Sequence, residues 1–183
     1  DIQFSIVSFI LCLFLFDFLS YVAHRLNHHF PFLWMFHFVH HSDNKINLST
    51  GFRSSFFEIF ILTLLYPIIL IIGFPFEMFF IVFVIFSIYQ VLMHSRYIGL
   101  PRFLEIIFVT PQYHLIHHSQ NIKNHNSNFG VLFSIWDRMF GTYTKNMSGN
   151  LFGVKDYYQS NFIKVHTDPM VDYYRKYIKP LIS

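Results

Sequence analysis

The feature that most limits how this chain can fold is a long stretch without basic residues, from Arg53 to Arg96. Its two apolar halves, residues 56–74 and 76–94, are each about 19 residues long. As helices they would extend about 28 Å, close to the roughly 30 Å thickness of a bilayer core. A Gly-Phe-Pro sequence separates the halves. The pattern predicts a membrane hairpin, with Pro67 as a kink in its first helix.

A further apolar run covers residues 3–23 and is interrupted by one acid, Asp17. Together with 54% hydrophobic and 13% charged residues, it predicts an all-α integral membrane protein. The run lacks the basic start and small-residue cleavage site of a secretory signal. Because the chain opens at Asp1 without Met, we expect that an upstream segment is missing.

Charge and cysteine content exclude several classes of function. The net charge of +3 is too small to indicate a nucleic-acid partner, and Cys12 is alone, so no intrachain disulfide forms. We find no glycine-rich phosphate loop, serine-hydrolase motif or zinc-protease motif. The twelve histidines are the unusual feature, because imidazole is costly in apolar surroundings unless it binds something.

Most of these histidines recur at helical spacing. The H-x-x-H-H pattern occurs twice, and a H-x-x-x-H pair closes the first apolar run. Such spacing presents several imidazoles from one helical turn, as metal ligands require. Nine ligand candidates are too many for one tetrahedral metal, which indicates two metal ions; imidazole without thiolate suits iron, zinc or copper. The candidates are His24, His28, His37, His40, His41, His94, His114, His117 and His118.

Basic residues flank the predicted membrane segments and indicate the orientation. By the positive-inside rule, Arg25, Arg53, Arg96 and Arg102 share the cytoplasmic side. A hairpin returns His94 to the side where the first span ends. We therefore expect a cytosolic, histidine-rich helical cap over a two-metal site.

Several other residues are candidates for supporting roles. Asp17 lies on the same helical stripe as Tyr21 and His24, and we expect its carboxylate to orient a ligand histidine. Glu105 and Asp137 are weaker candidates of the same kind. Trp34 and Tyr21 are expected to shape a substrate tunnel. The remaining expectations are that Glu58 and Glu77 mark membrane ends and that His29, His125 and His166 face solvent or support the ligands.

The chain divides in two at about residue 145. Residues 1–145 form the membrane domain, in which 102–109 is expected to be a short interfacial helix and Pro111 to start a new segment. Residues 146–183 form a polar tail. In the tail, Asp168 and Pro169 are expected to begin a short amphipathic helix that ends before Pro180.

The ordered motifs HRLNH, HFVHHS, a lone histidine after a hairpin, TPQYHLIHHS, NSNFG and IWDRMFGTY resemble those of the fatty acid hydroxylase and sterol desaturase superfamily. The alkylglycerol monooxygenase branch and its bacterial relatives look most similar. The resemblance implies that the nine histidines bind two irons, with zinc as a substitute, that dioxygen is the oxidant and that the substrate is an aliphatic lipid.

The resulting hypothesis is a membrane-bound di-iron oxygenase that hydroxylates a C–H bond of a fatty acyl, sterol or ether lipid. It requires an external electron donor, either a protein partner or a small reductant. A lipid desaturase with the same site and a non-catalytic zinc-binding membrane protein are the alternatives. We expect a bacterial inner membrane with the site facing the cytoplasm, or else the endoplasmic reticulum.

Overall fold

The computed structural model describes residues 2–58, 64–146, 151–157 and 161–182, and every regular element in those ranges is helical. The expected all-α fold is thus confirmed for this part of the chain. The elements are α1 (Ile6–His29), α2 (Pro31–His41), η1 (Leu48–Phe52), α4 (Pro67–Ile72), α5 (Phe76–Met93), η2 (Arg102–Ile106), α6 (Pro111–His117), η3 (Ile122–Asn124), α7 (Ile135–Met139), α8 (Phe162–Tyr173), η4 (Tyr174–Ile178, a π-helix) and α9 (Lys179–Ile182).

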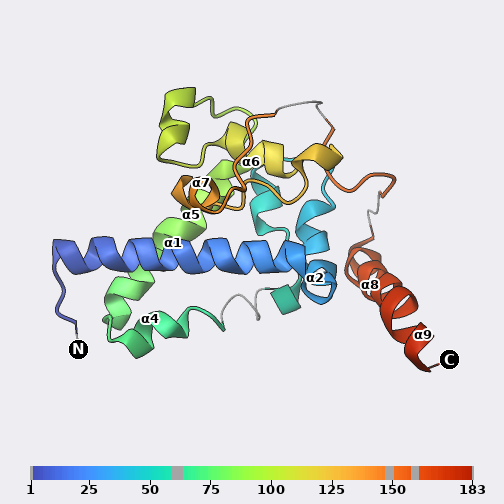
Figure 1. Ribbon diagram of the computed structural model, residues 1–183, viewed down its shortest axis with the longest axis horizontal. Coiled ribbons are helices and arrows are strands. Elements are labelled where there is room, and N and C mark those ends of the chain that lie inside the picture. The colour runs from blue at the N-terminus through green and yellow to red at the C-terminus, as the bar shows by residue number, and fades with distance from the viewer. Residues whose placement is uncertain (1, 59–63, 147–150, 158–160, 183) are drawn as a thin grey trace.

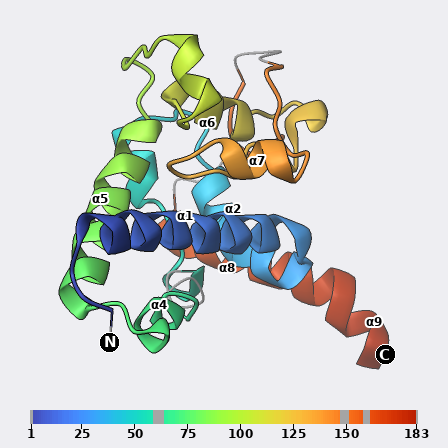
Figure 2. The same ribbon diagram turned by 60° about the vertical axis from the view of Figure 1, so that its left-hand side comes forward.

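Helix α1 is the longest element and runs through the centre of the molecule (Figure 1). It begins at a reciprocal capping box between Ser5 and Ser8, which satisfies backbone N–H groups of the first turn. Helices α6 and α7 lie on one side of it and α4 on the other, while α2 and α8 lie at its C-terminal end (Figures 1 and 2). Its C-terminal end is therefore surrounded by other elements.

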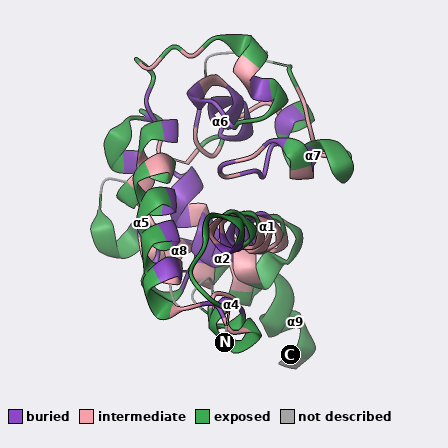
Figure 3. Cartoon of the chain, turned by 90° about the vertical axis from the view of Figure 1, so that its left-hand side faces the viewer, coloured by how far each residue is buried: buried purple, intermediate pink, exposed green. Residues whose placement is uncertain are grey.

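Within the described residues, two helices, α1 and α5, are long and apolar enough to cross a membrane. Seen along α1, helix α5 passes across it instead of running beside it, and much of its surface is exposed (Figure 3). The two helices pack through a core of Cys12, Phe16, Met78, Val82 and Phe86. This contact brings the C-terminal end of α5 toward the last turns of α1.

The first half of the expected hairpin is not one continuous helix. Residues 64–66 form a turn, and α4 covers only Pro67–Ile72. Pro67 begins this helix rather than kinking it, because the first helical position needs no N–H donor. Helix α4 ends at Gly73, whose φ of 107° favours glycine. Residues 59–63 of this half lie outside the described part.

The loop that precedes α7 is attached to α1 by Asp17, whose side chain is fully buried. Its carboxyl oxygens accept hydrogen bonds from the backbone N–H of Leu132 at 2.9 Å and of Phe133 at 3.1 Å. They also accept one from the indole of Trp136 at 2.8 Å. Three donors on one buried carboxyl hold the loop against the helix.

The shorter elements partly follow the expectations. Helix α6 begins at Pro111, as expected, and the Thr110 side chain accepts a hydrogen bond from the backbone N–H of Tyr113. The expected helix over 102–109 is a 3-10 helix that stops at Ile106, because Phe108 instead forms a β-bridge with the loop before α7.

The C-terminal helix starts earlier than expected. The side chain of Asn161 caps α8, so Pro169 lies inside the helix and Asp168 does not begin it. Nor does Pro180 end it: a π-helical turn follows α8 directly, and Pro180 is the second residue of α9, which continues from that turn without a break. Helix α8 packs against α2. The division of the chain at residue 145 stays a prediction.

Replacing Asp17 with Asn should destabilise the protein, because one amide cannot accept from three donors and its NH2 group would face one of them. We expect the free energy of unfolding to fall by about 3 kcal/mol. Thermal unfolding in detergent, followed by labelling of the buried Cys12 thiol, measures the change. The exposed Asp172→Asn is the matched control, and equal melting temperatures for the two variants would contradict the role given to Asp17.

Candidate metal centre

Four segments that are distant in sequence bring the nine predicted histidines together. They come from the last turns of α1, from α2, from the residue after α5, and from α6 with its C-cap. Their ligand nitrogens form two groups, within each of which all lie within 4.8 Å of one another. The first group is His24, His28, His37, His41 and His117; the second group is His40, His94, His114 and His118.

The distances within the groups are those of ligands around a common centre. In the first group, the Nε2 atom of His41 lies 3.1 Å from that of His37 and 3.0 Å from that of His117. In the second group, the Nε2 atom of His114 lies 3.1 Å from that of His94. Two nitrogens at right angles around a metal, each about 2.1 Å from it, are about 3.0 Å apart. The groups therefore have the dimensions of metal sites.

The other ring nitrogen of several histidines is occupied by a backbone carbonyl. The Nδ1 atom of His24 donates to the carbonyl of Phe129, and that of His117 donates to the carbonyl of Ser127. In the same way His40 donates to Arg53 and His94 to Gln90. A carbonyl only accepts, so the proton must be on Nδ1 and the Nε2 lone pair faces the centre. This is the usual arrangement of metal-binding imidazoles.

The contact between His40 and His94 is the strongest indication of a bound cation. Their Nε2 atoms are 3.2 Å apart, and neither carries a proton because both Nδ1 atoms donate to carbonyls. Two lone pairs at this distance repel unless a cation lies between them. The buried Nε2 atom of His24 has no hydrogen-bond partner either. These residues therefore fit bound metal ions.

Burial also keeps the imidazoles in the neutral form that binds metal. Desolvation lowers the pKa of His117 to about 3 and that of His94 to about 4. Burial likewise lowers the pKa of His40, His41 and His114 well below the usual value. A charged imidazolium is disfavoured there, first because water is excluded and then, for the latter three, because neighbouring imidazoles would repel it.

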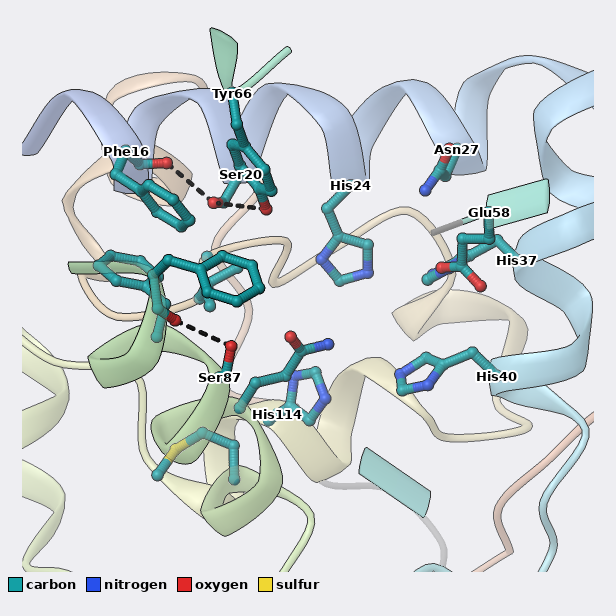
Figure 4. A pocket seen from close by; sticks show the side chains of 16 residues that line it. Phe16, Ser20, His24, Asn27, His37, His40, Glu58, Tyr66, Ser87 and His114 are labelled. Carbon is teal, nitrogen blue, oxygen red and sulfur yellow. Dashed lines mark hydrogen bonds and ion pairs between the residues drawn. The ribbon is translucent and has the colours of Figure 1, made fainter. Parts of the chain in front are cut away.

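A cavity of about 100 Å³ reaches both histidine groups from the apolar helix surfaces. Figure 4 shows Phe16 and Tyr66 at one end and His37 and His40 at the other. The same wall includes Phe83, Phe86 and Val131. We call it the lipid-side cavity, since its apolar end is built from α1 and α5, the two candidate membrane helices.

Two polar side chains in this cavity keep an unused atom. Asn27 lies between two ligand histidines on α1, and its Nδ2 atom is buried without a partner. Glu58 accepts from Nδ1 of His37 through one carboxyl oxygen, while its other oxygen is buried without a partner. Figure 4 shows both beside His37. A free donor and a free acceptor thus lie at the histidine end of the cavity.

The supporting residues expected from the sequence lie elsewhere. Asp17 binds a loop and an indole, and no ligand histidine, so its expected partner was wrong. The hydroxyl of Tyr21 contacts Thr142 and Arg25, and the residue is absent from the lining of the lipid-side cavity. Glu105 accepts from Thr110 at the start of α6. These side chains stabilise the fold, because their hydrogen bonds go to loop residues and to the N-cap of α6.

One acid was misassigned from the sequence, and another, the weaker candidate Asp137, supports a ligand histidine only through a loop. Glu58 does not mark a membrane end but is 4% exposed and bound to His37; an acid in so apolar a stretch was itself a signal. Asp137 is fully buried and accepts from the backbone N–H of Phe129 and Gly130 and from the hydroxyl of Tyr113. It thereby fixes the loop whose Phe129 carbonyl holds His24. Sequence spacing carries no trace of that contact.

The remaining histidines lie outside both groups. His29 and His125 are exposed, and His166 donates from Nδ1 to the carbonyl of Phe162 within α8. Trp34 is likewise absent from the lining of the lipid-side cavity, and it packs against the rings of His28 and His41 on another side.

Comparisons with known proteins agree with this site. The alkylglycerol monooxygenase of Caenorhabditis elegans is 34% identical over 136 residues, which are 74% of this chain and 27% of that protein. The human alkylglycerol monooxygenase is 32% identical over 75% of this chain and 31% of its own length. The ornithine lipid hydroxylase OlsE of Rhizobium tropici is 31% identical over 69% of this chain and 39% of its own. No solved structure matches.

The chain therefore aligns with less than half the length of each of these relatives. The family model described as fatty acid hydroxylase matches residues 9–142, a range that contains all nine histidines of the two groups. As the resemblance of the motifs predicted, the chain belongs to the fatty acid hydroxylase family.

Proposed function

We propose that the two histidine groups bind the two irons of a membrane lipid hydroxylase that uses dioxygen to oxidise an aliphatic C–H bond. The observation that carries this proposal is the pair of unprotonated Nε2 atoms of His40 and His94, which are 3.2 Å apart, together with the lining of the lipid-side cavity by His40. Family membership and the two candidate membrane helices support it.

The residues of the chain have two roles: the histidines hold the irons, and the groups around them position the imidazole rings and the substrate. The irons, when bound, supply the reduction of dioxygen and the oxidising power for the C–H bond. Backbone carbonyls and Glu58 fix the imidazole rings from outside, so that the ligand nitrogens need no rearrangement when metal binds. The apolar wall from Phe16 to Phe86 excludes water and admits a segment of an alkyl chain directly from the bilayer.

The unused atoms of Asn27 and Glu58 favour a substrate with an oxygen near the carbon that reacts. A buried amide donor without a partner costs about 1 to 3 kcal/mol, which a substrate hydroxyl or ether oxygen would recover. A hydroxyl would satisfy both residues, since it accepts from Asn27 and donates to Glu58. We therefore place oxygen-bearing lipids ahead of plain hydrocarbon chains.

The alternatives differ in what they require of this site. A desaturase would begin with the same attack on a C–H bond and would differ in its product. A structural zinc site would be closed by its ligands, whereas here His24, His37, His40 and His114 line a cavity, which favours an enzyme. We place the enzyme in a bacterial inner membrane, with the endoplasmic reticulum as the alternative, and its histidines at the cytoplasmic side.

Metal content tests the two-ion assignment. Protein purified in detergent from iron-supplemented cells should contain about two irons per chain by mass spectrometry. His40→Ala and His117→Ala each remove a ligand from a different group, so each should lower the content toward one. His166→Ala, outside both groups, should change nothing. Two metals retained in both ligand variants would refute the site, whereas two zincs in place of iron would support the two-ion site, since zinc is the expected substitute there.

The role of Glu58 is tested through product formation. Glu58→Gln keeps an acceptor for His37 but removes the negative charge, so lipid hydroxylation should fall by about 10- to 100-fold. Incorporation of 18O from labelled dioxygen into the lipid, followed by mass spectrometry, measures it. Glu77→Gln, which changes the other acid of the apolar stretch, should keep full activity. Equal rates for both variants would contradict the assignment.

The selectivity expected from Asn27 is tested with two substrates of equal chain length, an alkylglycerol and an alkane. Asn27→Leu should reduce the preference of the enzyme for the alkylglycerol by about tenfold, because the amide donor is lost. Asn27→Ser, which keeps a donor, should retain most of it. An unchanged preference in Asn27→Leu, measured by competition, would remove Asn27 from substrate recognition.

A further inference from the structure

A second cavity, of about 420 Å³, opens on the other side of the first histidine group. Its wall includes His28, His41 and His117, whereas the lipid-side cavity touches His24 and His37 of the same group. The two linings share no residue. The first histidine group thus lies between two separate cavities. We call the second one the polar cavity.

The polar cavity is lined by a cation, Lys155, whereas the lipid-side cavity is lined by an acid, Glu58. Around its histidine floor it presents N–H and O–H donors from His29, His125 and Ser119 and the ammonium group of Lys155. No Asp or Glu is among its described lining residues. Donors and a cation without a carboxylate favour a ligand rich in acceptors and negatively charged. Its volume is that of sites for small molecules.

A lipid hydroxylase needs a second route of this kind, an argument that rests on the proposed function. Hydroxylation of R–H by dioxygen consumes two electrons, and the lipid occupies the first cavity while they are delivered. The donor must therefore reach the centre from elsewhere. Trp34 lines the polar cavity, and its ring centroid lies 5.0 Å from that of His28 and 5.3 Å from that of His41. A donor bound in this cavity would contact the Trp34 ring, which packs against the ligand candidates His28 and His41.

We propose that the polar cavity is the binding site of the electron donor, and that this donor is a small, water-soluble, anionic organic reductant that gives up two electrons and a proton. With AH⁻ as this reductant and A as its oxidised form, the reaction is R–H + O2 + AH⁻ + H⁺ → R–OH + H2O + A. Two electrons leave AH⁻, and one oxygen atom of O2 leaves as water. The donor does not enter the lipid-side cavity.

The outer wall of the polar cavity comes from the C-terminal tail, beyond the residues that match the family model. Gly153, Val154, Lys155 and Tyr177 form it. Gly153 has φ 88° and lies so close to residues 43 and 44 that a Cβ atom would be 3.1 Å from the Asp43 carbonyl oxygen. A β-bridge between Ser119 and Phe152 joins the same segment to the end of α6. The charged wall is therefore fixed in place.

The charge preference of the cavity is tested first on metal-free protein, by quenching of Trp34 fluorescence. The difference between the wild type and Trp34→Phe isolates this tryptophan from the other one in the chain. The ratio of iodide quenching to caesium quenching should be higher for Trp34 than for free N-acetyltryptophanamide, which corrects for the weaker intrinsic quenching by caesium. Lys155→Glu should lower the ratio to that of the free compound, whereas Lys164→Glu, the same charge change on the exposed face of α8, should not. A wild-type ratio no higher than that of the free compound would overturn the proposal.

Reduction of the oxidised iron-loaded protein by ascorbate, followed by absorbance in a stopped-flow instrument, tests the donor itself. The rate should saturate with ascorbate, and Lys155→Glu should raise the half-saturating concentration about fivefold. Lys164→Glu should leave the half-saturating concentration of ascorbate unchanged. With neutral hydroquinone as the reductant, Lys155→Glu and the wild type should have the same half-saturating concentration. A rate that never saturates, or that ignores Lys155, would overturn the proposal. If the protein instead fails to bind iron, the proposed function fails, while the quenching result still decides whether the cavity selects anions.

Discussion

The rest of the structure depends on how the two ring nitrogens are used in five of the ligand candidates, His24, His37, His40, His94 and His117. The outer nitrogen donates to a carbonyl or to Glu58 and so fixes both the ring and its proton. The inner nitrogen is left with a lone pair that faces other lone pairs. Such a cluster is repulsive by itself and becomes favourable only around cations, so the fold holds a geometry that its own side chains would not choose.

That geometry is maintained by groups that never touch the centre. Asp137 fixes the loop that presents the Phe129 carbonyl to His24, and Asp17 attaches the next part of this loop to α1. Gly130 is required between them, because a Cβ atom would lie 2.8 Å from the Phe133 carbonyl oxygen. The buried acids are therefore used as acceptors for backbone donors, which hold the loop against α1 and α7.

Helical spacing predicted a large part of this arrangement. Each H-x-x-H-H pattern places its three imidazoles on one face of a single helix, which was enough to nominate ligand candidates but not to predict how they divide into two groups. The roles of Asp17, Tyr21 and Glu105 were not predictable in this way. Whether a buried acid binds an imidazole or a distant loop is decided by tertiary contacts, such as the one between Asp17 and Leu132, which no local pattern records.

The break before α4 was missed for a related reason. Hydropathy reported a continuous apolar stretch, but a helix also requires an uninterrupted series of backbone donors, which Pro67 does not supply. The tail shows the reverse case, since Pro180 does not end a helix when the residues before it change register through a π-turn.

The spread of the ligands along the chain also sets the order of events during synthesis. The first histidine group draws on residues from His24 to His117, and the second on residues from His40 to His118. Neither group is complete until the ribosome has passed residue 117, after α1 and α5 have been made. A chain truncated before α6 would therefore contain both candidate membrane helices but an incomplete set of histidines in each group.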